Sequence, residues 1–375
     1  MQRMQPRSAI FKASLFFLPA LLVIVVFFFI PVVITTVMGF TDMDFRFQWD
    51  FIGLDNYKKM AKDFLIWPID GYLTQPSPVG WGVFILITAL LVFYFVRYLR
   101  GRPSSIRGPL QLSLITFVVL AGVWFFIQAL SGQLAKPNII VNTVVYVLGT
   151  LFIFNTTFGL ILAILTTSIG RRAGTFFRAV WLLPRFTPPV VYGIIWLALL
   201  QPSKRGMFNA AREFFGLEPL DWITAHPWGV IIVTGGFIGA SMGMIIFAAA
   251  IDSIPEDYRR AAKVDGASWF QEIRYIILPL IRWPLLFITA YQTLSLLTSF
   301  EYILIITSGG PFFASSVWSL YAYKLAFDAY SGTYAYGYGA ALATILVVIG
   351  IIASVVYWRI FKFKEMMAEP KIEVT

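Results

Sequence analysis

Eight long apolar runs constrain the fold of this 375-residue chain more than any other feature. Each is long enough to cross about 30 Å of hydrocarbon as a helix rising about 1.5 Å per residue. The runs cover residues 13–40, 80–99, 109–131, 138–168, 177–200, 228–251, 283–306 and 336–358. Backbone groups in lipid must be hydrogen-bonded internally, and the two-residue alternation of a membrane barrel strand does not appear. The sequence therefore predicts an all-α polytopic membrane protein with about eight transmembrane helices.

Composition and charge place the chain in a membrane rather than on nucleic acid. Hydrophobic residues make up 59% of the chain and the mean hydropathy is +0.78, whereas about half of a soluble domain is apolar. The 12 Trp, 17 Tyr and 36 Phe suit aromatic belts at the two lipid–water boundaries. The net charge of +10 comes from only 13% charged residues, which fall between the apolar runs. We therefore expect no nucleic-acid partner, and the absence of cysteine excludes disulfides and thiolate chemistry.

The distribution of basic residues predicts the orientation. Most of the 29 Lys and Arg residues fall on one side of the membrane if the runs alternate. Positive residues are retained in the cytoplasm, so we expect both termini and the segment 252–282 to lie inside. The first run is too long for a signal peptide and has no small-residue cleavage site near its end, which indicates a retained span.

The polar segment 252–282 carries the most specific pattern in the chain. It holds two adjacent alanines, then Asp-Gly-Ala and, further along, Leu-Pro. This segment resembles the cytoplasmic coupling segment, or EAA loop, of ABC import permeases. The resemblance implies a short helix-turn-helix that docks into a groove on an ATPase subunit. It assigns ATPase coupling to Tyr258, Arg260, Ala261, Ala262, Asp265, Gly266, Ala267 and Pro279.

Each residue type in this pattern has a physical purpose. The two alanines allow a helix to approach a groove closely, Gly266 permits a sharp turn, and Pro279 ends the element. Tyr258 and Trp269 supply apolar anchors. Arg260 stands where the family usually has Glu, so that it faces either an acidic group of the ATPase or water. An ordinary charged cytoplasmic loop is the alternative for the whole segment.

Other stretches resemble the carbohydrate-uptake, maltose-type branch of these permeases. They are Gly53–Tyr57, Asn142-Thr143 with Gly159–Ala163, Leu183–Trp196 with Gly206 and Asn209, Phe300-Glu301 with Thr307–Pro311, and Tyr336–Tyr338 with Ala340-Ala341. The resemblance covers residues 138–364 and 1–60 and implies the type I ABC importer permease fold. It divides the chain into a tail, first span and outer loop (1–64), an inserted two-span hairpin (65–136), a permease core (137–364) and a cytoplasmic tail (365–375). The hairpin is an addition to the common six-span form.

By the same resemblance, sugar contacts fall on the spans before and after the coupling segment. The positions repeat at i, i+3, i+4 and i+7, so each set occupies one helix face near mid-span, where transporter sites lie. The residues are Gly235, Ile238, Gly239 and Met242 on the first span, and Gln292, Ser295, Leu296 and Ser299 on the second. For any one of these residues, the alternative is that it only packs helices together, as small residues do in many membrane proteins. This alternative fits Gln292 least well, because its amide needs hydrogen-bond partners in a membrane.

The charges of the spans favour a neutral, hydroxyl-rich substrate. No Lys or Arg lies in the interior of the core spans other than 177–200, where Arg185 is expected close to the inner end of its helix. Glu301 is the only carboxylate well inside a span. A structural partner or water is its expected contact, and direct substrate contact is the alternative.

The expected function is the permease subunit of an ATP-driven sugar or oligosaccharide importer, not an enzyme. The sequence has no P-loop pattern, His/Cys cluster or nucleophile elbow, so ATP and Mg²⁺ are expected on partner subunits, with no cofactor or metal on this chain. The resemblance implies a second homologous permease, two ATP-binding subunits and an extracytoplasmic solute-binding protein, in the inner (cell) membrane of a prokaryote.

Two alternatives stay open. One is a permease for another polar solute, such as a polyol or glycerol phosphate. The other is an ATP-independent secondary transporter, which needs carboxylates or histidines at mid-membrane. The one histidine, His226, falls in a predicted outer loop.

Overall fold

The computed structural model of the chain describes residues 17–47, 50–64, 139–311, 313–327 and 334–360, with a few positions between 82 and 89. Every regular element in this described part is a helix, apart from an isolated β-bridge between Thr41 and Phe51. The predicted all-α class is confirmed. Apart from those few positions, the inserted hairpin 65–136 with its two spans lies outside the described residues, as does the tail 365–375.

Several helices have the length and composition of membrane spans. Four single helices qualify: Phe17–Met38, Ile139–Ser168, Pro227–Asp252 and Tyr336–Arg359. They coincide with the first, fourth, sixth and last predicted runs. Two bent helix pairs also qualify, so the described residues hold 4 to 6 candidate spans. The total of eight stays a prediction.

The predicted run 177–200 is not one helix, which corrects the sequence analysis. α8 (Arg171–Phe186) ends before Thr187, and α9 (Pro189–Leu199) leaves it at 100°. Proline has no N–H to donate and forces the residue before it out of the helical region, so the pair Pro188-Pro189 ends α8 and starts α9. An average of hydropathy along the run does not detect this break.

The run 283–306 is also broken. α16 (Arg282–Thr298) ends at Ser299, whose backbone is extended, and α17 (Glu301–Ile306) follows. A helix end leaves carbonyl groups without partners. The hydroxyl of Ser319 donates to the Ser299 carbonyl at 3.0 Å, so one of the groups near the break is paired.

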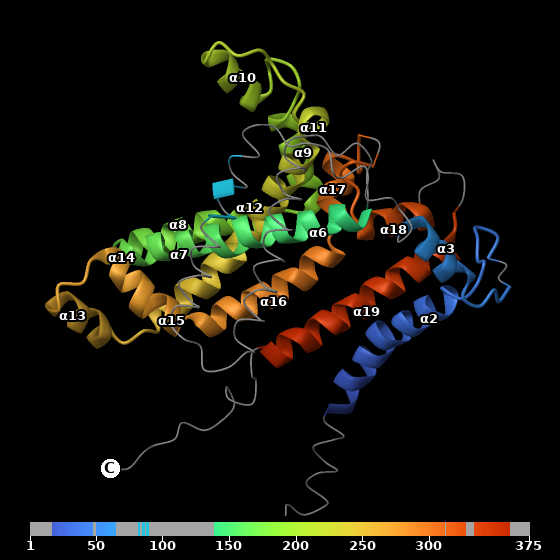
Figure 1. Cartoon of the computed structure of the whole chain (residues 1–375), viewed down its shortest axis with the longest axis horizontal. Coiled ribbons are helices and arrows are strands. Elements are labelled where there is room, and N and C mark those ends of the chain that lie inside the picture. Colours follow the sequence, from blue (N-terminus) through green and yellow to red (C-terminus); the bar gives the residue numbers. More distant parts are fainter. Residues whose placement is uncertain are drawn as a thin grey trace, which may run out of the picture. The chain divides into compact units, whose positions relative to one another are not determined.

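The larger of two compact units comprises the described residues within 68–320 and 350–375 and is built around α12 (Pro227–Asp252). A nearly continuous helix, formed by α6 (Ile139–Gly149), the π-helix η3 (Thr150–Phe158) and α7 (Gly159–Ser168), packs along α12, as do α8 and α16 (Figure 1). Small residues allow the close approach. A Cβ at Gly159 would lie 3.0 Å from the Ala240 carbonyl oxygen, as in other closely packed membrane helices.

The Asn142-Thr143 pair fixes the loop that precedes α18 (Trp318–Phe327). Asn142 is fully buried, and its Nδ2 donates to carbonyl oxygens of the loop 313–316 at 2.9 to 3.2 Å. The Thr143 hydroxyl accepts the backbone N–H of Trp318 at 2.8 Å. The two polar residues therefore provide hydrogen-bond partners for N–H and C=O groups of a buried loop, which has no helical hydrogen bonds of its own.

A second asparagine orders the loop between α9 and α12, which contains α10 (Met207–Phe214) and α11 (Trp222–Ala225). The Asn209 amide nitrogen donates to the Gln201 and Leu220 carbonyls, both at 2.9 Å. Its amide oxygen accepts the indole N–H of Trp222 at 3.1 Å. Asn209 thus joins the two ends of this loop.

The smaller unit comprises the described residues within 1–67 and 321–349. It contains the helix Phe17–Met38, whose last parts are η1 (Val25–Phe29) and α2 (Ile30–Met38), then α3 (Asp55–Phe64) and most of α18 and α19 (Tyr336–Ile360). The amide of Asn56 donates to the carbonyls of Gly39 and Thr41 at 3.1 and 2.8 Å. The stretch Gly53–Tyr57 thus closes the end of α2.

Candidate functional site

A cavity of about 240 Å³ lies in the larger unit, between α6, η3, α8, α12, α16 and α17. Its walls hold every predicted substrate residue except Met242. Those residues are Gly235, Ile238, Gly239, Gln292, Ser295, Leu296 and Ser299. Tyr146, Asn155, Arg185 and Tyr302 complete the lining. Three of the four predicted α12 positions and all four predicted α16 positions therefore lie around one space.

Met242 lies outside this space. It packs against the apolar cluster around Met244 and Phe247. Seven residues of helix separate it from Gly235, a rise of about 10 Å. The helix face that Gly235 shares with Met242 therefore extends past the residues that line the cavity.

The two cavity glycines serve close packing rather than empty room. A Cβ at Gly235 would lie 2.9 Å from the hydroxyl oxygen of Tyr146, and a Cβ at Gly239 would overlap the amide of Asn155. The missing side chains therefore make space for Tyr146 and Asn155 in the cavity wall. Gly235 and Gly239 therefore pack against neighbouring side chains and also line the cavity, so both interpretations of these two residues apply.

Gln292 has the partner that its burial requires. It is 3% exposed, and its Nε2 donates to the carbonyl oxygen of Gly239 at 3.0 Å. This bond joins α16 to α12 at the cavity. Ser295 on α16, Ser299 at its end and Tyr146 on α6 belong to the same lining. The wall formed by these residues offers hydroxyl and amide groups of the kind that bind sugar hydroxyls.

Asn155 is a cavity residue that the sequence analysis missed. It is 0% exposed, and neither its Nδ2 nor its Oδ1 has a hydrogen-bond partner among the described residues. It lies in the π-helix η3, and π-helical turns within α-helices are frequent at functional sites. The polar triplet Asn155-Thr156-Thr157 inside an apolar run was the available signal.

Arg185 is the second important omission. The sequence placed it close to the inner end of its helix, away from the pathway, yet its half-buried side chain lines the cavity. The break at Pro188 is the reason, since it ends α8 beside α12 and directs α9 away at 100°. No carboxylate in the described part of the chain forms an ion pair with Arg185.

Glu301 has a local structural role. It is exposed at the start of α17, and its carboxylate accepts the backbone N–H of Phe300 at 3.2 Å. It is absent from the cavity lining. The sequence left two contacts open for Glu301, a structural partner or water and the substrate, and the structure shows a structural partner.

The segment 252–282 forms the predicted helix-turn-helix. α13 (Glu256–Val264) and α14 (Trp269–Glu272) flank Gly266, whose φ is +74°. The N–H of Ala267 donates to Ala262 and that of Gly266 to Lys263, at 2.9 and 3.1 Å, which is the Schellman pattern that ends a helix with a left-handed glycine. Ser268 and Gln271 then form a capping box that starts α14.

The two alanines of this element face different ways. Ala262 is 9% exposed and packs within the helix-turn-helix, whereas Ala261 is exposed. Arg259 on α13 forms a hydrogen-bonded ion pair with Glu272 on α14, and Glu272 is buried. This pair holds the two helices together. Arg260 pairs with Glu256, one turn earlier on the same exposed face.

Apolar side chains are exposed along the outside of this element. Tyr258 is 56% exposed, Trp269 57%, Phe270 64% and Tyr275 69%. A hollow of about 270 Å³ opens nearby, lined by Ala262, Asp265, Gly266, Ala267, Gln271, Tyr275 and Ile276. Pro279 lies in the next helical turn, α15 (Leu278–Leu280), which follows η4 (Ile273–Ile277) and precedes the 68° bend into α16.

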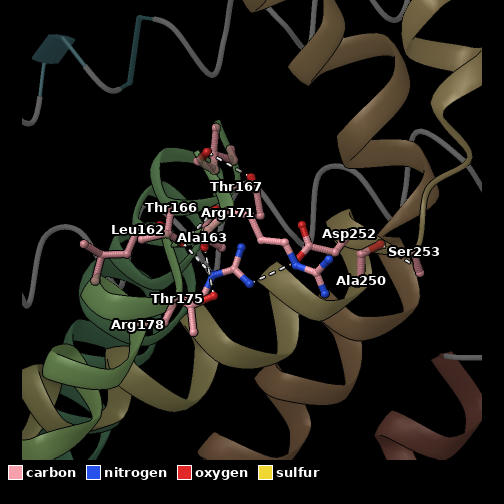
Figure 2. A network of polar contacts seen from close by, with 11 residues as sticks. Leu162, Ala163, Thr166, Thr167, Arg171, Thr175, Arg178, Ala250, Asp252 and Ser253 are labelled. Atoms are coloured by element: carbon pink, nitrogen blue, oxygen red, sulfur yellow. Dashed lines mark hydrogen bonds and ion pairs between the residues drawn. The ribbon is translucent and has the colours of Figure 1, made fainter. Parts of the chain in front are cut away.

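A polar network fastens the end of α12 from which this element begins (Figure 2). The Arg178 guanidinium on α8 donates to the Asp252 carboxylate at 2.8 Å and to the Thr166 hydroxyl at 3.2 Å. Thr166 in turn donates to the Leu162 carbonyl at 2.8 Å. These bonds join α7, α8 and α12 at this end of the core.

Comparison with known proteins identifies the class of protein to which this fold belongs. Residues 155–362 match the family described as binding-protein-dependent transport system inner membrane component, and the chain belongs to this family. It is therefore a multi-pass membrane protein and a transport component. This agrees with the expected resemblance.

Three relatives with permease names illustrate the match. The galactooligosaccharides transport system permease protein GanP of Bacillus subtilis (strain 168) is 29% identical over 221 residues, covering 57% of this chain and 51% of GanP. A probable ABC transporter permease of Pyrococcus horikoshii is 32% identical over 206 residues, covering 53% of this chain and 68% of that protein. The trehalose/maltose transport system permease protein MalF of Thermococcus litoralis is 27% identical over 189 residues, covering 50% and 62%. The chain thus spans about half the length of GanP and somewhat more of the other two.

Two solved structures share the fold. One is a bacterial alginate ABC transporter in complex with its alginate pentasaccharide-bound periplasmic protein, at a TM-score of 0.52 and 24% identity, covering 58% of this chain and 75% of the matched chain. The other is a bacterial ABC transporter involved in the import of the acidic polysaccharide alginate, at a TM-score of 0.52 and 21% identity, covering 68% and 96%. The chain has the ABC importer permease fold that the sequence predicted.

Proposed function

We propose that this chain is the permease subunit of an ATP-driven importer of sugars or oligosaccharides and forms part of the translocation pathway. The observation that carries this proposal is the cavity at which α12 and α16 present Gly239, Gln292, Ser295 and Ser299. Polar groups at a break in a membrane helix are typical of transporter sites. The carbohydrate substrates named for GanP, MalF and the alginate transporters support this class of solute.

The helix-turn-helix 256–272 is the proposed contact to an ATP-binding subunit. Its exposed Tyr258, Trp269 and Phe270 provide an apolar surface, and the adjoining hollow has room for a side chain of the partner. Burying such a surface stabilises association by about 25 cal/mol per Å² before the costs of binding are subtracted. The assembly would comprise a second homologous permease, two ATP-binding subunits that hold ATP and Mg²⁺, and an extracytoplasmic solute-binding protein. Both termini would be cytoplasmic.

Transport would proceed by alternating access. Closure of the ATP-binding subunits displaces the helix-turn-helix, and the Arg178–Asp252 ion pair carries that displacement into α8 and α12. The cavity lies between these same helices. It would therefore open to the solute-binding protein when ATP is bound and to the cytoplasm after hydrolysis.

Two other functions are less well supported. A secondary transporter requires an ionisable group for ion coupling, and no carboxylate or histidine lines the cavity in the described part of the chain. A polyol or glycerol phosphate importer would share this architecture. It would differ from a sugar importer only in the solute that it transports.

Reconstitution tests the proposal. The tagged chain is purified from its native membrane with its associated subunits, placed in proteoliposomes with the solute-binding protein, and assayed for uptake of labelled saccharides. We expect uptake that requires internal ATP. Uptake driven by an ion gradient without ATP, or ATP-driven uptake confined to polyols or glycerol phosphate, would contradict it.

The two alanines provide a matched test of coupling. Ala261→Trp enlarges an exposed position and should block docking while the helix-turn-helix stays folded. A bulky residue at Lys263, also exposed and on another side of the helix, is the control. Co-purification of the ATP-binding subunit is measured for both. Equal recovery with the two variants would remove Ala261 from the contact.

A further inference from the structure

We infer that Arg185 binds an acidic group of the transported solute, so that the substrate class is a saccharide carrying a carboxylate, such as a uronic acid. The inference rests on the proposed function and narrows it. It also reverses the expectation of a neutral substrate, which depended on a pathway without cations.

The charge of the cavity is the first argument. Arg185 is the one charged side chain among the described residues that line it. A guanidinium stays protonated in a protein, and an unpaired charge within a membrane is costly. No carboxylate of the described chain is ion-paired with it, and Glu301 is exposed and bonded to the Phe300 backbone. An anion in the cavity would supply the missing counter-charge.

Asn155 gives an independent observation at the same cavity. Its amide is fully buried, and both amide atoms are without hydrogen-bond partners in the described part of the chain. Buried polar atoms are nearly always paired, so an orphaned amide on a cavity wall indicates a bound partner. The amide packs directly against Gly239, since a Cβ there would overlap it. The Nδ2 group can donate to a carboxylate or hydroxyl of the solute.

The balance of charge favours a carboxylate over a phosphate ester. A carboxylate carries one negative charge and accepts two parallel hydrogen bonds from the guanidinium fork. A phosphate ester carries nearly two charges at neutral pH and leaves one of them without a cation in this wall. The remaining polar lining is neutral, with hydroxyl and amide groups of Tyr146, Gln292 and Ser295 suited to sugar hydroxyls. A single acidic sugar unit therefore matches the site.

The test uses the complete transporter with its solute-binding protein in proteoliposomes. The probes are trimers of galacturonate, glucuronate and mannuronate, their neutral hexose counterparts, and glucose 6-phosphate. We expect ATP-driven uptake of at least one uronate trimer, at least about 10-fold faster than its neutral counterpart, because hydrogen bonds to charged groups are the strong ones.

Three variants separate recognition from folding. Arg185→Gln should lower uptake of the uronate about 10- to 100-fold while stimulation of ATP hydrolysis by the binding protein is kept. Arg185→Lys keeps the charge and should retain part of the uptake. Asn155→Asp adds a like charge and should impair the uronate more than a neutral trimer. Arg205→Gln, at an exposed position in the loop after α9, is the control and should resemble the wild type.

The outcomes distinguish this inference from the function on which it rests. Rapid uptake of neutral trimers without preference for uronates overturns the role of Arg185 and leaves sugar import intact. Preference for glucose 6-phosphate overturns the carboxylate. Equal uronate uptake by Arg185→Gln and the wild type also overturns the inference. Absence of uptake for every saccharide refutes the proposed function itself, and the inference with it.

Discussion

Replacing Gly239 by alanine should damage the wall of the cavity. The new Cβ would overlap the Asn155 amide, and the neighbouring Gly239 carbonyl accepts the Gln292 amide at 3.0 Å. Overpacking costs about 1–3 kcal/mol, and loss of the Gln292 bond adds about 1 kcal/mol. Alanine in a helix regains about 1 kcal/mol relative to glycine. The net expectation is a destabilisation of about 1–3 kcal/mol.

Gly229 provides the control on the same helix. A Cβ there has its nearest neighbour at 3.9 Å, so Gly229→Ala should leave stability unchanged or raise it by up to about 1 kcal/mol. Thermal unfolding of the detergent-solubilised complex, read from tryptophan fluorescence, compares the two variants, and sugar uptake is measured in parallel. We expect a lower melting temperature and reduced uptake for Gly239→Ala alone.

A double variant tests the stated cause. Asn155→Ala removes the amide that the new methyl group would strike, so Gly239→Ala with Asn155→Ala should be less destabilised than the sum of the single changes by about 1 kcal/mol or more. Additive effects, or a Gly239→Ala variant as stable and active as Gly229→Ala, would refute the packing argument.

Three further predictions address topology and coupling. A cysteine at Ser203 should react with an impermeant maleimide from outside intact cells and one at Ser268 should not; external labelling of Ser268 would overturn the orientation. Gly266→Ala places a Cβ on a left-handed residue, with a cost of about 1 kcal/mol, and should weaken recovery of the ATP-binding subunit in a pull-down, whereas unchanged recovery would show that the turn tolerates strain. Arg178→Gln should lower uptake per ATP hydrolysed without loss of the cavity, because its partner Asp252 is half exposed and the pair adds only about 1 kcal/mol or less to stability; a stoichiometry equal to the wild type would remove the ion pair from coupling.

Local signals allowed much of the fold to be predicted. Hydropathy located the spans that are single helices, and Gly266 with the capping residues Ser268 and Gln271 marks the turn of the helix-turn-helix. The prolines at 188 and 189 also held the information for the break between α8 and α9. Averaging over an apolar run hid it, because hydropathy measures transfer to lipid and not backbone geometry.

The cavity was only partly predictable for a different reason. The helix faces of α12 and α16 follow from periodicity, but the residues that complete the wall come from other elements. Asn155 and Tyr146 reach the cavity because Gly239 and Gly235 have no side chains in the way, which is a tertiary relation. Arg185 reaches it through a 100° bend. Neither the contacts at Gly239 and Gly235 nor the bend that places Arg185 can be derived from residue spacing along the sequence.

The cavity and the coupling segment share one rigid element, α12. Gly239 and Asp252 lie thirteen residues apart on it, about 20 Å along the helix axis. Glycines and small residues let α12 pack closely on η3 and α7. Under the proposed coupling, a tilt imposed at Asp252 would therefore displace the cavity wall instead of being absorbed by loose side chains. Gln292 ties the same wall to α16, the helix that emerges from the other end of the coupling segment. Both ends of the helix-turn-helix are therefore joined, through α12 and α16, to the residues proposed to hold the sugar, and this connection is the physical basis for expecting one motion to serve both sites.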